Sequence, residues 1–279
     1  MQQGHYNIGL PAWAFPGWHG RYFNSTPSVL ASYASVFNTV EGNTTFYHVP
    51  DKQSVANWQE AVQHTEFQFC FKFPRTVTHQ RSPDKQALNL FLKRIAPLGS
   101  NIGPFLLQFP ATVGPADIPY MDSLIQQLPT EYRYALEIRH PDFFTNPELI
   151  EPLIEKHQLG RVIMDTRPVF NGDRHHPEVL AALHAKPDLP VLSQAYNKMV
   201  FVRLLLHPDL NSNDPYITQW ASRIAKALSL GASCTMMIHC PNNQHCPELA
   251  VDFHEKLRAL TQRIDPLPPW PVPQQQHLL

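Results

Sequence analysis

Eight short apolar runs of β-forming residues recur along the chain, and they limit its fold more than any other feature of the sequence. Each run has the length of a strand and is rich in β-branched or aromatic residues. Helical patterns separate the runs, which predicts an α/β fold built on a parallel sheet. The runs are Tyr6–Leu10, Val36–Glu41, Phe67–Phe73, Pro104–Phe109, Arg133–Arg139, Arg161–Asp165, Val200–Leu206 and Cys234–His239.

Helix start and stop signals lie between these runs. Four residues with capping side chains precede a proline, where the cap can accept hydrogen bonds from the first helical turn: Thr26, Ser82, Asn146 and Asp214. Three helical patterns are followed by a glycine, which can adopt the left-handed conformation that ends a helix: Gly99, Gly160 and Gly231.

The alternation of eight strands with helices predicts a single (β/α)8 TIM barrel. An open, doubly wound sheet is the competing fold, and the lack of a GxGxxG motif after the first run weakens its dinucleotide-binding form. We assign residues 1–265 to the barrel domain. The stretch DPLPPWPVPQQQHLL predicts that residues 266–279 form an extended Pro-rich C-terminal tail that packs Trp270 on the barrel.

Composition narrows the classes of partner. The net charge is -1, so no strong field favours nucleic acid or an anionic membrane, and nucleic acid binding would need a local patch. No apolar run approaches the roughly 20 residues of a membrane span. The N-terminus lacks the basic and apolar regions of a signal peptide. These features predict a soluble cytoplasmic protein, and they say nothing of its oligomeric state.

Polar side chains stand at the C-terminal ends of most runs, which is where barrel enzymes place their active sites. Alternation along FQFCFKF directs Lys72 into the barrel and the phenylalanines out. Glu137 and Arg139 share one parity and can pair, and Arg203 aligns with His207. Burying so many charges is costly unless they pair or bind a ligand. Further polar residues at or near the ends of their runs are Glu41, Gln108, Asp165 and His239.

The charges of this predicted site balance, because three acids oppose Lys72, Arg139 and Arg203. A divalent-metal site usually carries a surplus of carboxylates and histidines, so the balance favours a polar or anionic ligand held by Arg and Lys. A Zn²⁺ or Mn²⁺ site is the alternative, and its ligands would come from Glu41, Glu137, Asp165, His140, His207 and His239.

The segment HCPNNQHCPE contains two cysteines and two histidines. The spacing of Cys240 and Cys246 matches no common structural zinc site, and the chain has no second CxxC motif. We therefore interpret the segment as the loop after the eighth run, with Cys246 opening a helix. Asn242 and Asn243 would then lie over the barrel mouth.

The ordered motifs VEGNTTFYHVP, FQFCFKFPRTVTH, LLQFP, LEIRH and IMDT resemble the YecE-like family, the domain of unknown function 72. The resemblance spans nearly the whole chain and implies a TIM barrel whose activity is not established. A distant likeness of that family to endonuclease-IV-type barrels implies, by analogy alone, phosphodiester chemistry. The chain departs from the family after Arg203 and after the eighth run. The site positions implied are Glu41, Asn43, Thr45, Phe46, Tyr47, Lys72, His79, Gln108, Glu137, Arg139, His140 and Asp165.

We predict a hydrolase or lyase-type barrel enzyme acting on a small polar or anionic substrate that bears phosphate or carboxylate. Its catalytic residues would be Glu41, Glu137, Asp165 and His239, with Glu41 or Glu137 as general acid or base, because a carboxylate in a partly dry pocket can have a raised pKa. Lys72, Arg139 and Arg203 would bind the anion. Asn43, Gln108 and Asn243 would orient it, and Trp13, Phe46 and Tyr47 would form an apolar wall.

Two alternatives belong to other classes. One is a metal-dependent nucleic-acid phosphodiesterase of the endonuclease-IV type, which needs a bound divalent metal and a basic rim. The other is a non-catalytic protein that binds a metabolite. A divalent metal is the one cofactor that the sequence leaves open.

Overall fold

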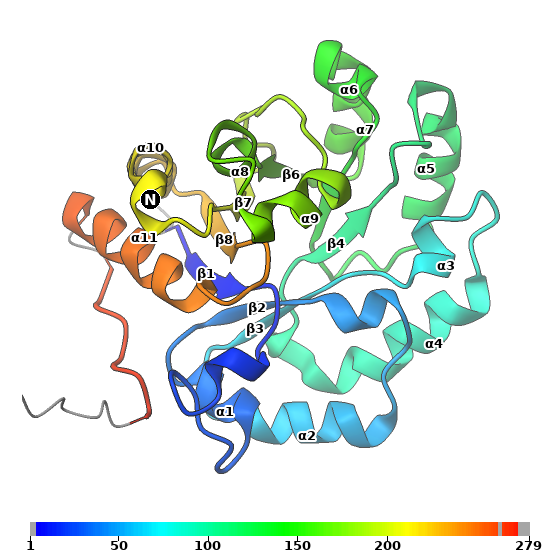
Figure 1. The fold of residues 1–279 in the computed structure, drawn as a ribbon. Helices are drawn as coiled ribbons and strands as arrows, with labels where there is room; N and C mark the ends of the chain where they lie inside the picture. The colour runs from blue at the N-terminus through cyan, green and yellow to red at the C-terminus, as the bar shows by residue number, and fades with distance from the viewer. Residues whose placement is uncertain (1–3, 262–263, 273–279) are drawn as a thin grey trace, which may run out of the picture.

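The computed structural model describes residues 4–261 and 264–272, which form a barrel of parallel strands surrounded by helices (Figure 1). The strands are hydrogen-bonded in the order β3-β2-β1-β8-β7-β6-β5-β4. Their bounds are β1 (Tyr6–Leu10), β2 (Thr39–Gly42), β3 (Gln68–Phe71), β4 (Phe105–Gln108), β5 (Tyr134–Glu137), β6 (Gly160–Asp165), β7 (Met199–Leu205) and β8 (Ser233–His239).

Strands β3 and β4 are joined by scattered bonds instead of a full ladder. The Gly103 N–H donates to the Phe69 carbonyl at 2.9 Å, and the Phe73 N–H donates to the Leu106 carbonyl at 3.3 Å. Lys72 and Leu106 form a parallel bridge. Because the two edges of the sheet meet here, the barrel is nearly closed, and the predicted (β/α)8 architecture is confirmed over an open sheet.

Helices link successive strands and lie outside the sheet (Figure 1). The α-helices are α1 (Val29–Ala34), α2 (Lys52–Val62), α3 (Arg75–Thr78), α4 (Lys85–Ile95), α5 (Ile118–Ile125), α6 (Asp142–Thr145), α7 (Glu151–Lys156), α8 (Arg167–Asn171), α9 (Pro177–Ala185), α10 (Asp214–Ser229) and α11 (Cys246–Leu260). Short 3-10 turns are η1 (Pro16–Trp18), η2 (Asn43–Phe46), η3 (Ala96–Asn101), η4 (Pro115–Asp117), η5 (Pro147–Leu149) and η6 (Leu210–Asn213). Within the described residues, no helix is both long and apolar enough to cross a membrane.

Two of the predicted helix starts are wrong by a few residues. Ser28, not Thr26, caps α1, and its side chain accepts from the Ala31 N–H at 3.0 Å. Asp84, not Ser82, caps α4 in the same way. In both places a second capping residue directly follows the proline, and the helix begins at the residue after it. A helix does begin at Asp214, but Asp214 is its first residue and not its cap, and the preceding Asn213 makes no side-chain cap. Asn146 likewise makes no side-chain cap and precedes only the short turn η5.

The predicted glycine stop is correct at Gly231, which has φ 79° and follows the end of α10. Gly99 also has a positive φ, 54°, but it interrupts the 3-10 turn η3, and α4 ends before it at Ile95. Gly160 does not end a helix, because it is the first residue of β6. Gln158, with φ 52°, takes the left-handed conformation there instead.

The two faces of the barrel strands carry different cores. The outward phenylalanines of β3 meet the helix layer, where Trp58 of α2 stacks on Phe71 with ring centroids 5.7 Å apart. Fully burying one such ring stabilises the fold by roughly 1.5–3 kcal/mol. A separate apolar cluster fills the middle of the barrel interior. It consists of Cys70, Leu106, Ala135, Val162, Met199, Phe201 and Met237.

The described part of the C-terminal stretch lies against the barrel. The Trp270 ring is 4.9 Å from Tyr22 and 5.8 Å from Phe23, and Asn24 Nδ2 donates to the Pro271 carbonyl at 2.8 Å. Residues 273–279 of the predicted tail lie outside the described residues. The domain boundary at residue 266 stays a prediction.

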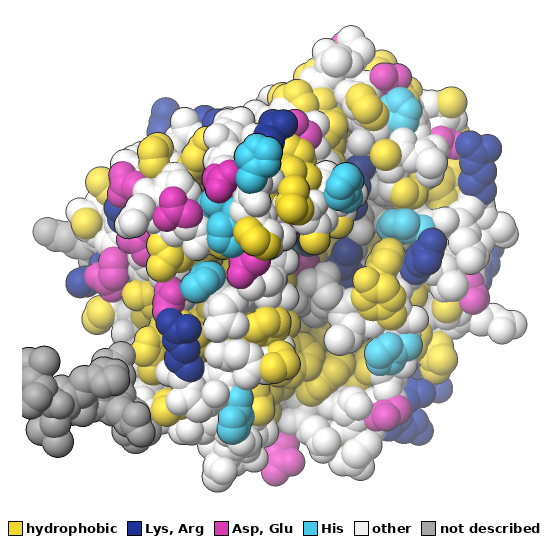
Figure 2. Space-filling model, in the orientation of Figure 1, with side chains coloured by type: hydrophobic (Ala, Val, Ile, Leu, Met, Phe, Trp, Pro, Cys, Tyr) yellow, Lys and Arg dark blue, Asp and Glu magenta, His cyan; other side chains and the backbone are white. Residues whose placement is uncertain are grey.

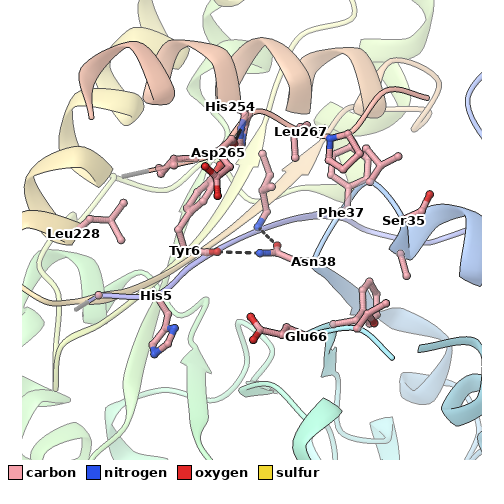
Figure 3. Close-up of a pocket in the computed structure, with 18 residues that line it drawn as sticks. His5, Tyr6, Ser35, Phe37, Asn38, Glu66, Leu228, His254, Asp265 and Leu267 are labelled. Atoms are coloured by element: carbon pink, nitrogen blue, oxygen red, sulfur yellow. Dashed lines mark hydrogen bonds between the residues drawn. The ribbon is translucent and has the colours of Figure 1, made fainter. Parts of the chain in front are cut away.

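A pocket beside this stretch lies at the N-terminal ends of the strands (Figure 3). Tyr6, Asn38, His254 and Leu267 are among the residues that line it. Asn38 bridges its floor, donating from Nδ2 to the Tyr6 carbonyl and accepting from the Ile8 N–H. Barrel enzymes hold their active sites at the opposite end, so we locate the candidate site from the C-terminal strand ends.

Candidate functional site

A layer of polar side chains covers the apolar cluster inside the barrel. Each of them stands two residues beyond a residue of the inner cluster or directly opposite one, so the alternation of the strands brings it inward. All are buried, with exposed fractions of 8% or less. We call this set the polar layer. It consists of Glu41, Lys72, Gln108, Glu137, Arg203 and His239.

Arg203 of β7 holds the polar layer together. Its Nε and Nη2 donate to the two carboxylate oxygens of Glu41, each at 2.8 Å. Its Nη1 donates to Glu137 Oε2, also at 2.8 Å. One guanidinium therefore bridges β2 and β5 across the barrel, using the planar fork that suits bidentate carboxylate binding.

Glu137 is the second centre of the network. Its Oε1 accepts from Arg139 Nε at 2.8 Å and from Gln108 Nε2. The predicted inward pairing of Glu137 with Arg139 is thus confirmed. His239 Nε2 lies 3.2 Å from Glu41 Oε2 and completes the ring on the other side. Breaking one partner of a buried pair of this kind costs about 3–5 kcal/mol, because it leaves a charge without compensation.

The carboxyl groups are held in their ionised form. Burial alone would raise the pKa of Glu137, but the charges of Arg203, Arg139 and Lys72 lower it to about 2. Arg203 and His239 likewise hold the pKa of Glu41 well below 4.5 against the effect of burial. The expected raised pKa is therefore wrong for both groups, because Arg203 neutralises the carboxylates that burial would otherwise protonate.

The histidine of this layer is neutral at physiological pH. Burial lowers the pKa of His239 to about 4, although the Glu41 charge opposes that shift. His79, on the loop after α3, has its pKa lowered to about 4 by burial and by the charge of Lys72. Neither ring adds positive charge to the mouth near neutral pH.

Lys72 is the unsatisfied member of the polar layer. Its Nζ lies 4.6 Å from the centre of the Phe46 ring, a cation–π contact. Among the described residues it makes no hydrogen bond or ion pair through Nζ. Burial and the charge of Arg203 lower its pKa from 10.5 to about 8. The Phe46 ring in turn packs on His79, with ring centroids 4.9 Å apart.

A second lysine, which sequence reasoning missed, joins the mouth. Lys186 directly follows α9, whose Val179 and Ala182 pack on Leu205 at the C-terminal end of β7. Burial lowers the pKa of Lys186, and the charges of Arg203, Glu41, Arg139 and Glu137 also act on it. These are the same four neighbours that act on Lys72. Lys186 Nζ too makes no hydrogen bond or ion pair with another described residue.

The mouth carries a surplus of positive charge. Two carboxylates, Glu41 and Glu137, oppose four cations, Lys72, Lys186, Arg139 and Arg203. The predicted balance changes because Lys186 enters and Asp165 leaves. In the described part of the chain, no three His, Cys, Asp or Glu side chains gather in a way that could hold a metal ion. The arrangement favours an anion over a cation.

Asp165 is the predicted catalytic residue that the structure does not bring to the mouth. Val162 of β6 belongs to the inner cluster, so Asp165 three residues later faces outward. Its carboxylate accepts from Arg167 Nε at 2.9 Å and from Trp220 Nε1 at 2.7 Å. It therefore ties β6 to the helix layer. Counting the alternation from Val162 would have found this.

Two residues of the motif after β2 hold the backbone together. The Thr45 hydroxyl lies 2.8 Å from the Gly42 carbonyl and 2.6 Å from the Lys72 carbonyl, joining the ends of β2 and β3. Asn43 Nδ2 donates to the Pro11 carbonyl at 3.0 Å. Both side chains fix the position of Lys72 and the loop around it.

The other predicted ligand contacts lie at the periphery. Trp13 is partly buried and packs edge-on against Trp58 at the margin of the core, with ring centroids 5.5 Å apart. Tyr47 is 79% exposed. His140 accepts from the Asp142 N–H through Nδ1 at 3.3 Å. Asn243 has φ 64°, and its carbonyl accepts from Trp18 Nε1 at 2.9 Å, so it shapes a turn.

A small cavity opens on the polar layer. Its volume is about 10 Å³, which is room for about one water molecule. Its lining includes Glu137, Arg139, Thr166 and Pro187. Thr166 Oγ1 donates to the Pro187 carbonyl at 3.0 Å and holds the segment after Lys186 beside it. Figure 2 shows this face hollowed right of centre, with Lys or Arg atoms inside and His side chains around the hollow.

Known proteins match the chain over nearly its whole length. A family model described as "Protein of unknown function DUF72" matches residues 7–276. The UPF0759 protein YecE of Escherichia coli K12 is 34% identical over 277 residues, which cover 97% of this chain and 98% of that protein. The protein of the same name from Escherichia coli O157:H7 matches with the same identity and coverage.

Two solved structures share the fold. A DUF72 family protein from Enterococcus faecalis V583 has a TM-score of 0.66 at 20% identity, covering 95% of this chain and 98% of that one. A DUF72 family protein from Thermotoga maritima MSB8 has a TM-score of 0.68 at 18% identity, covering 91% of this chain and 99% of that one. At such identities the likeness concerns the fold alone.

Proposed function

The chain belongs to the DUF72 family of proteins of unknown function, and we propose that the mouth of its barrel binds a small anionic substrate and transfers a proton through Lys72. The substrate carries a phosphate or carboxylate group. Arg203, Glu41 and Glu137 form the rigid base of this site. Lys72, Lys186 and Arg139 contact the anion.

The observation that carries this proposal is the pair of lysines without partners. Every charged group deeper in the polar layer has a partner, since Arg203 holds both carboxylates. Lys72 is buried and Lys186 is half-buried, and neither makes a hydrogen bond or ion pair through Nζ with a described residue. Buried ammonium groups are costly unless an anion meets them, so a ligand supplies the missing partner.

Proton transfer falls to Lys72 instead of the carboxylates. A general acid or base works best when its pKa lies near the operating pH. The pKa of Lys72 is about 8, whereas that of Glu137 is about 2. Glu41 and Glu137 then act as positioning residues, which hold Arg203 and set the field around the amine.

Arg139 suits the binding of the anionic group. Its side chain is 24% exposed and pairs with one oxygen of Glu137 through Nε and Nη2. The guanidinium retains further N–H donors for a ligand. The cavity beside it has room for about one water molecule, so binding of a phosphate or carboxylate group requires the segment around Pro187 to shift.

Isothermal titration calorimetry with inorganic phosphate and with malonate tests the anion site. The variants are Lys72→Met, Lys186→Met and, as the matched control, Lys226→Met, an exposed lysine near the end of α10. We expect saturable binding of at least one probe to wild type, weakened roughly tenfold by losing one charged donor. Lys226→Met should bind as wild type does. Equal affinity in all four proteins, or no binding to any, would overturn the proposal.

A covalent role for the same amine is a second candidate. An amine with a pKa near 8 and an unbonded Nζ can form a Schiff base with a carbonyl substrate. Incubation with glyoxylate and sodium borohydride, followed by peptide mass mapping, tests this role. A reduced adduct at Lys72 that phosphate suppresses supports covalent chemistry. An adduct spread over exposed lysines such as Lys226, with none at Lys72, leaves acid–base transfer as the role of Lys72.

A further inference from the structure

The segment between β8 and α11 begins and ends with a cysteine, and the two thiols touch. Cys240 Sγ and Cys246 Sγ are 3.5 Å apart. Both are free thiols and both are buried, with exposed fractions of 2% and 0%. The function proposed above uses neither of them.

We propose that Cys240 and Cys246 are a reversible redox pair that a hydroperoxide oxidises to an intramolecular disulfide. Their sulfur atoms need to approach from 3.5 Å to about 2.05 Å to form the bond. The five residues between them, 241–245, are half-buried. A local opening of this turn admits an oxidant as small as hydrogen peroxide.

Cys240 occupies the position of the attacking thiolate. Its sulfur accepts a hydrogen bond from the Cys246 thiol and from the backbone N–H groups of His245 and Cys246, at the start of α11. The bond from Cys246 and those from the backbone lower the pKa of Cys240 against the effect of burial. The N-terminus of a 15-residue helix also stabilises a negative charge placed there.

Cys246 occupies the position of the resolving thiol. Burial and the neighbouring Cys240 raise the pKa of Cys246. Its thiol therefore stays protonated and donates a hydrogen bond to the Cys240 sulfur. In the first step Cys240 thiolate attacks the hydroperoxide oxygen and the O–O bond breaks. The proton that Cys240 released goes to the leaving oxygen, so that a sulfenic acid and an alcohol form, or water when the oxidant is hydrogen peroxide. In the second step Cys246 sulfur attacks the sulfenic sulfur and releases water. The two thiols lose two electrons in total, and the hydroperoxide gains them.

A metal does not explain this pair. No group of three His, Cys, Asp or Glu side chains that could hold a metal ion occurs in residues 4–261 and 264–272. The adjacent His245 is directed elsewhere, with Nδ1 3.3 Å from Glu248 Oε2. Two sulfurs in contact without further ligands match a dithiol better than a zinc site.

The pair also lies next to the anion site. His239, the residue before Cys240, contacts Glu41 in the polar layer. The turn between the cysteines accepts hydrogen bonds from Trp18 Nε1 at the carbonyls of Asn243 and Gln244. A disulfide would therefore close a short loop directly behind the end of β8.

The chain provides its own controls, which need no variant. Cys70 lies in the inner cluster and Cys234 at the start of β8. Each lacks a second thiol, and burial raises the pKa of both to about 12. If oxidation depended only on the presence of a cysteine, these two would react as well.

Native wild-type protein is treated with hydrogen peroxide, and free thiols are then alkylated in denaturant and mapped by mass spectrometry. We expect a Cys240–Cys246 cross-link lighter by two hydrogen atoms, with Cys70 and Cys234 alkylated. Dithiothreitol should restore alkylation at both positions. Full alkylation of Cys240 and Cys246 after peroxide, or equal oxidation of Cys70 and Cys234, would overturn the proposal.

Two variants then separate the roles of the sulfurs. Cys246→Ser should stop the reaction at the sulfenic acid, which dimedone traps at Cys240. Cys240→Ser should leave Cys246 unoxidised under the same conditions. Dimedone labelling of Cys246 in the second variant, at the rate of Cys240 in the first, would contradict the assignment of attacking and resolving thiols.

Discussion

At the scale of single residues, the barrel mouth retains one buried charge without a charged partner, Lys72. Arg203 satisfies two carboxylates at once, and Gln108, Arg139 and His239 take most of their remaining lone pairs. Lys72 receives only the face of Phe46. Functional sites often retain a group that destabilises the fold, because the ligand and not the protein supplies its partner.

We expect Lys72→Met to stabilise the folded protein while it weakens anion binding. Since the folded pKa of about 8 lies below the usual 10.5, the unfolded chain binds this proton more tightly. The resulting penalty is fully present below about pH 8 and fades as the pH rises toward 10.5. Urea denaturation at pH 7 should show a free energy of unfolding higher by roughly 1–3 kcal/mol.

Lys226→Met is the control for that measurement. It removes an equally long side chain from an exposed position, so its free energy of unfolding should stay within about 0.5 kcal/mol of wild type. Equal or lower stability of Lys72→Met would show that Lys72 is not a costly buried charge.

At the scale of elements, the alternation of side chains along each strand explains which site residues the sequence predicts correctly and which it does not. Parity placed Lys72, Glu137 and Arg203 correctly, because each stands on a run whose alternation is clear. Asp165 was assigned by its place at the end of a run, without counting from Val162, and it faces the helix layer. Lys186 lies in a loop after α9 with no motif, and only the packing of α9 on β7 brings it to the mouth.

Asp165→Asn tests the structural role of that side chain. Its carboxylate accepts from the Arg167 side chain and from Trp220 Nε1, so the change leaves the guanidinium without its charged partner. We expect the free energy of unfolding to fall by about 1–3 kcal/mol, because water compensates part of the charge of Arg167, whose side chain is 33% exposed, with the phosphate affinity unchanged. Asp188→Asn, at an exposed position after Lys186, should leave stability unaltered. If the folded Asp165→Asn variant no longer binds phosphate, Asp165 belongs to the binding site after all.

At the scale of the whole molecule, the barrel follows from eight strand runs and the helices between them, because few folds close so many parallel strands. The predicted helix boundaries fail where two caps compete, as at Thr26 and Ser28. The mouth needs three dimensions, since Arg203, Glu41 and Glu137 come from three separate strands. The short distances between Arg203 and the two carboxylates lower the pKa of Glu41 and of Glu137. From the sequence alone we expected a raised pKa.

The buried network also predicts how stability depends on pH. Glu137 has a pKa of about 2 in the fold against a usual 4.5, so its contribution is present above about 4.5 and is lost as pH falls toward 2. His239 and His79, with pKa values of about 4 against 6.5, add a loss between about 6.5 and 4. Each group changes the free energy of unfolding by up to about 1.4 kcal/mol per pH unit within its window.

Urea denaturation over this pH range checks the dependence. Glu137→Gln should be less stable near neutral pH and lose less stability on acidification, since one titrating group is gone. A wild-type free energy of unfolding that is flat between pH 6.5 and 3 would contradict the buried ionised network.

The proposed function places an anion between Lys72 and Lys186 over the polar layer. The most direct test is a crystal structure of the wild-type protein soaked with selenate, whose anomalous scattering locates the ion without assumptions about its contacts. We expect an anomalous peak within hydrogen-bond distance of both Nζ atoms, and the loss of this peak in crystals of Lys72→Met. Selenate bound only elsewhere on the molecule, with the mouth holding water alone, would contradict it.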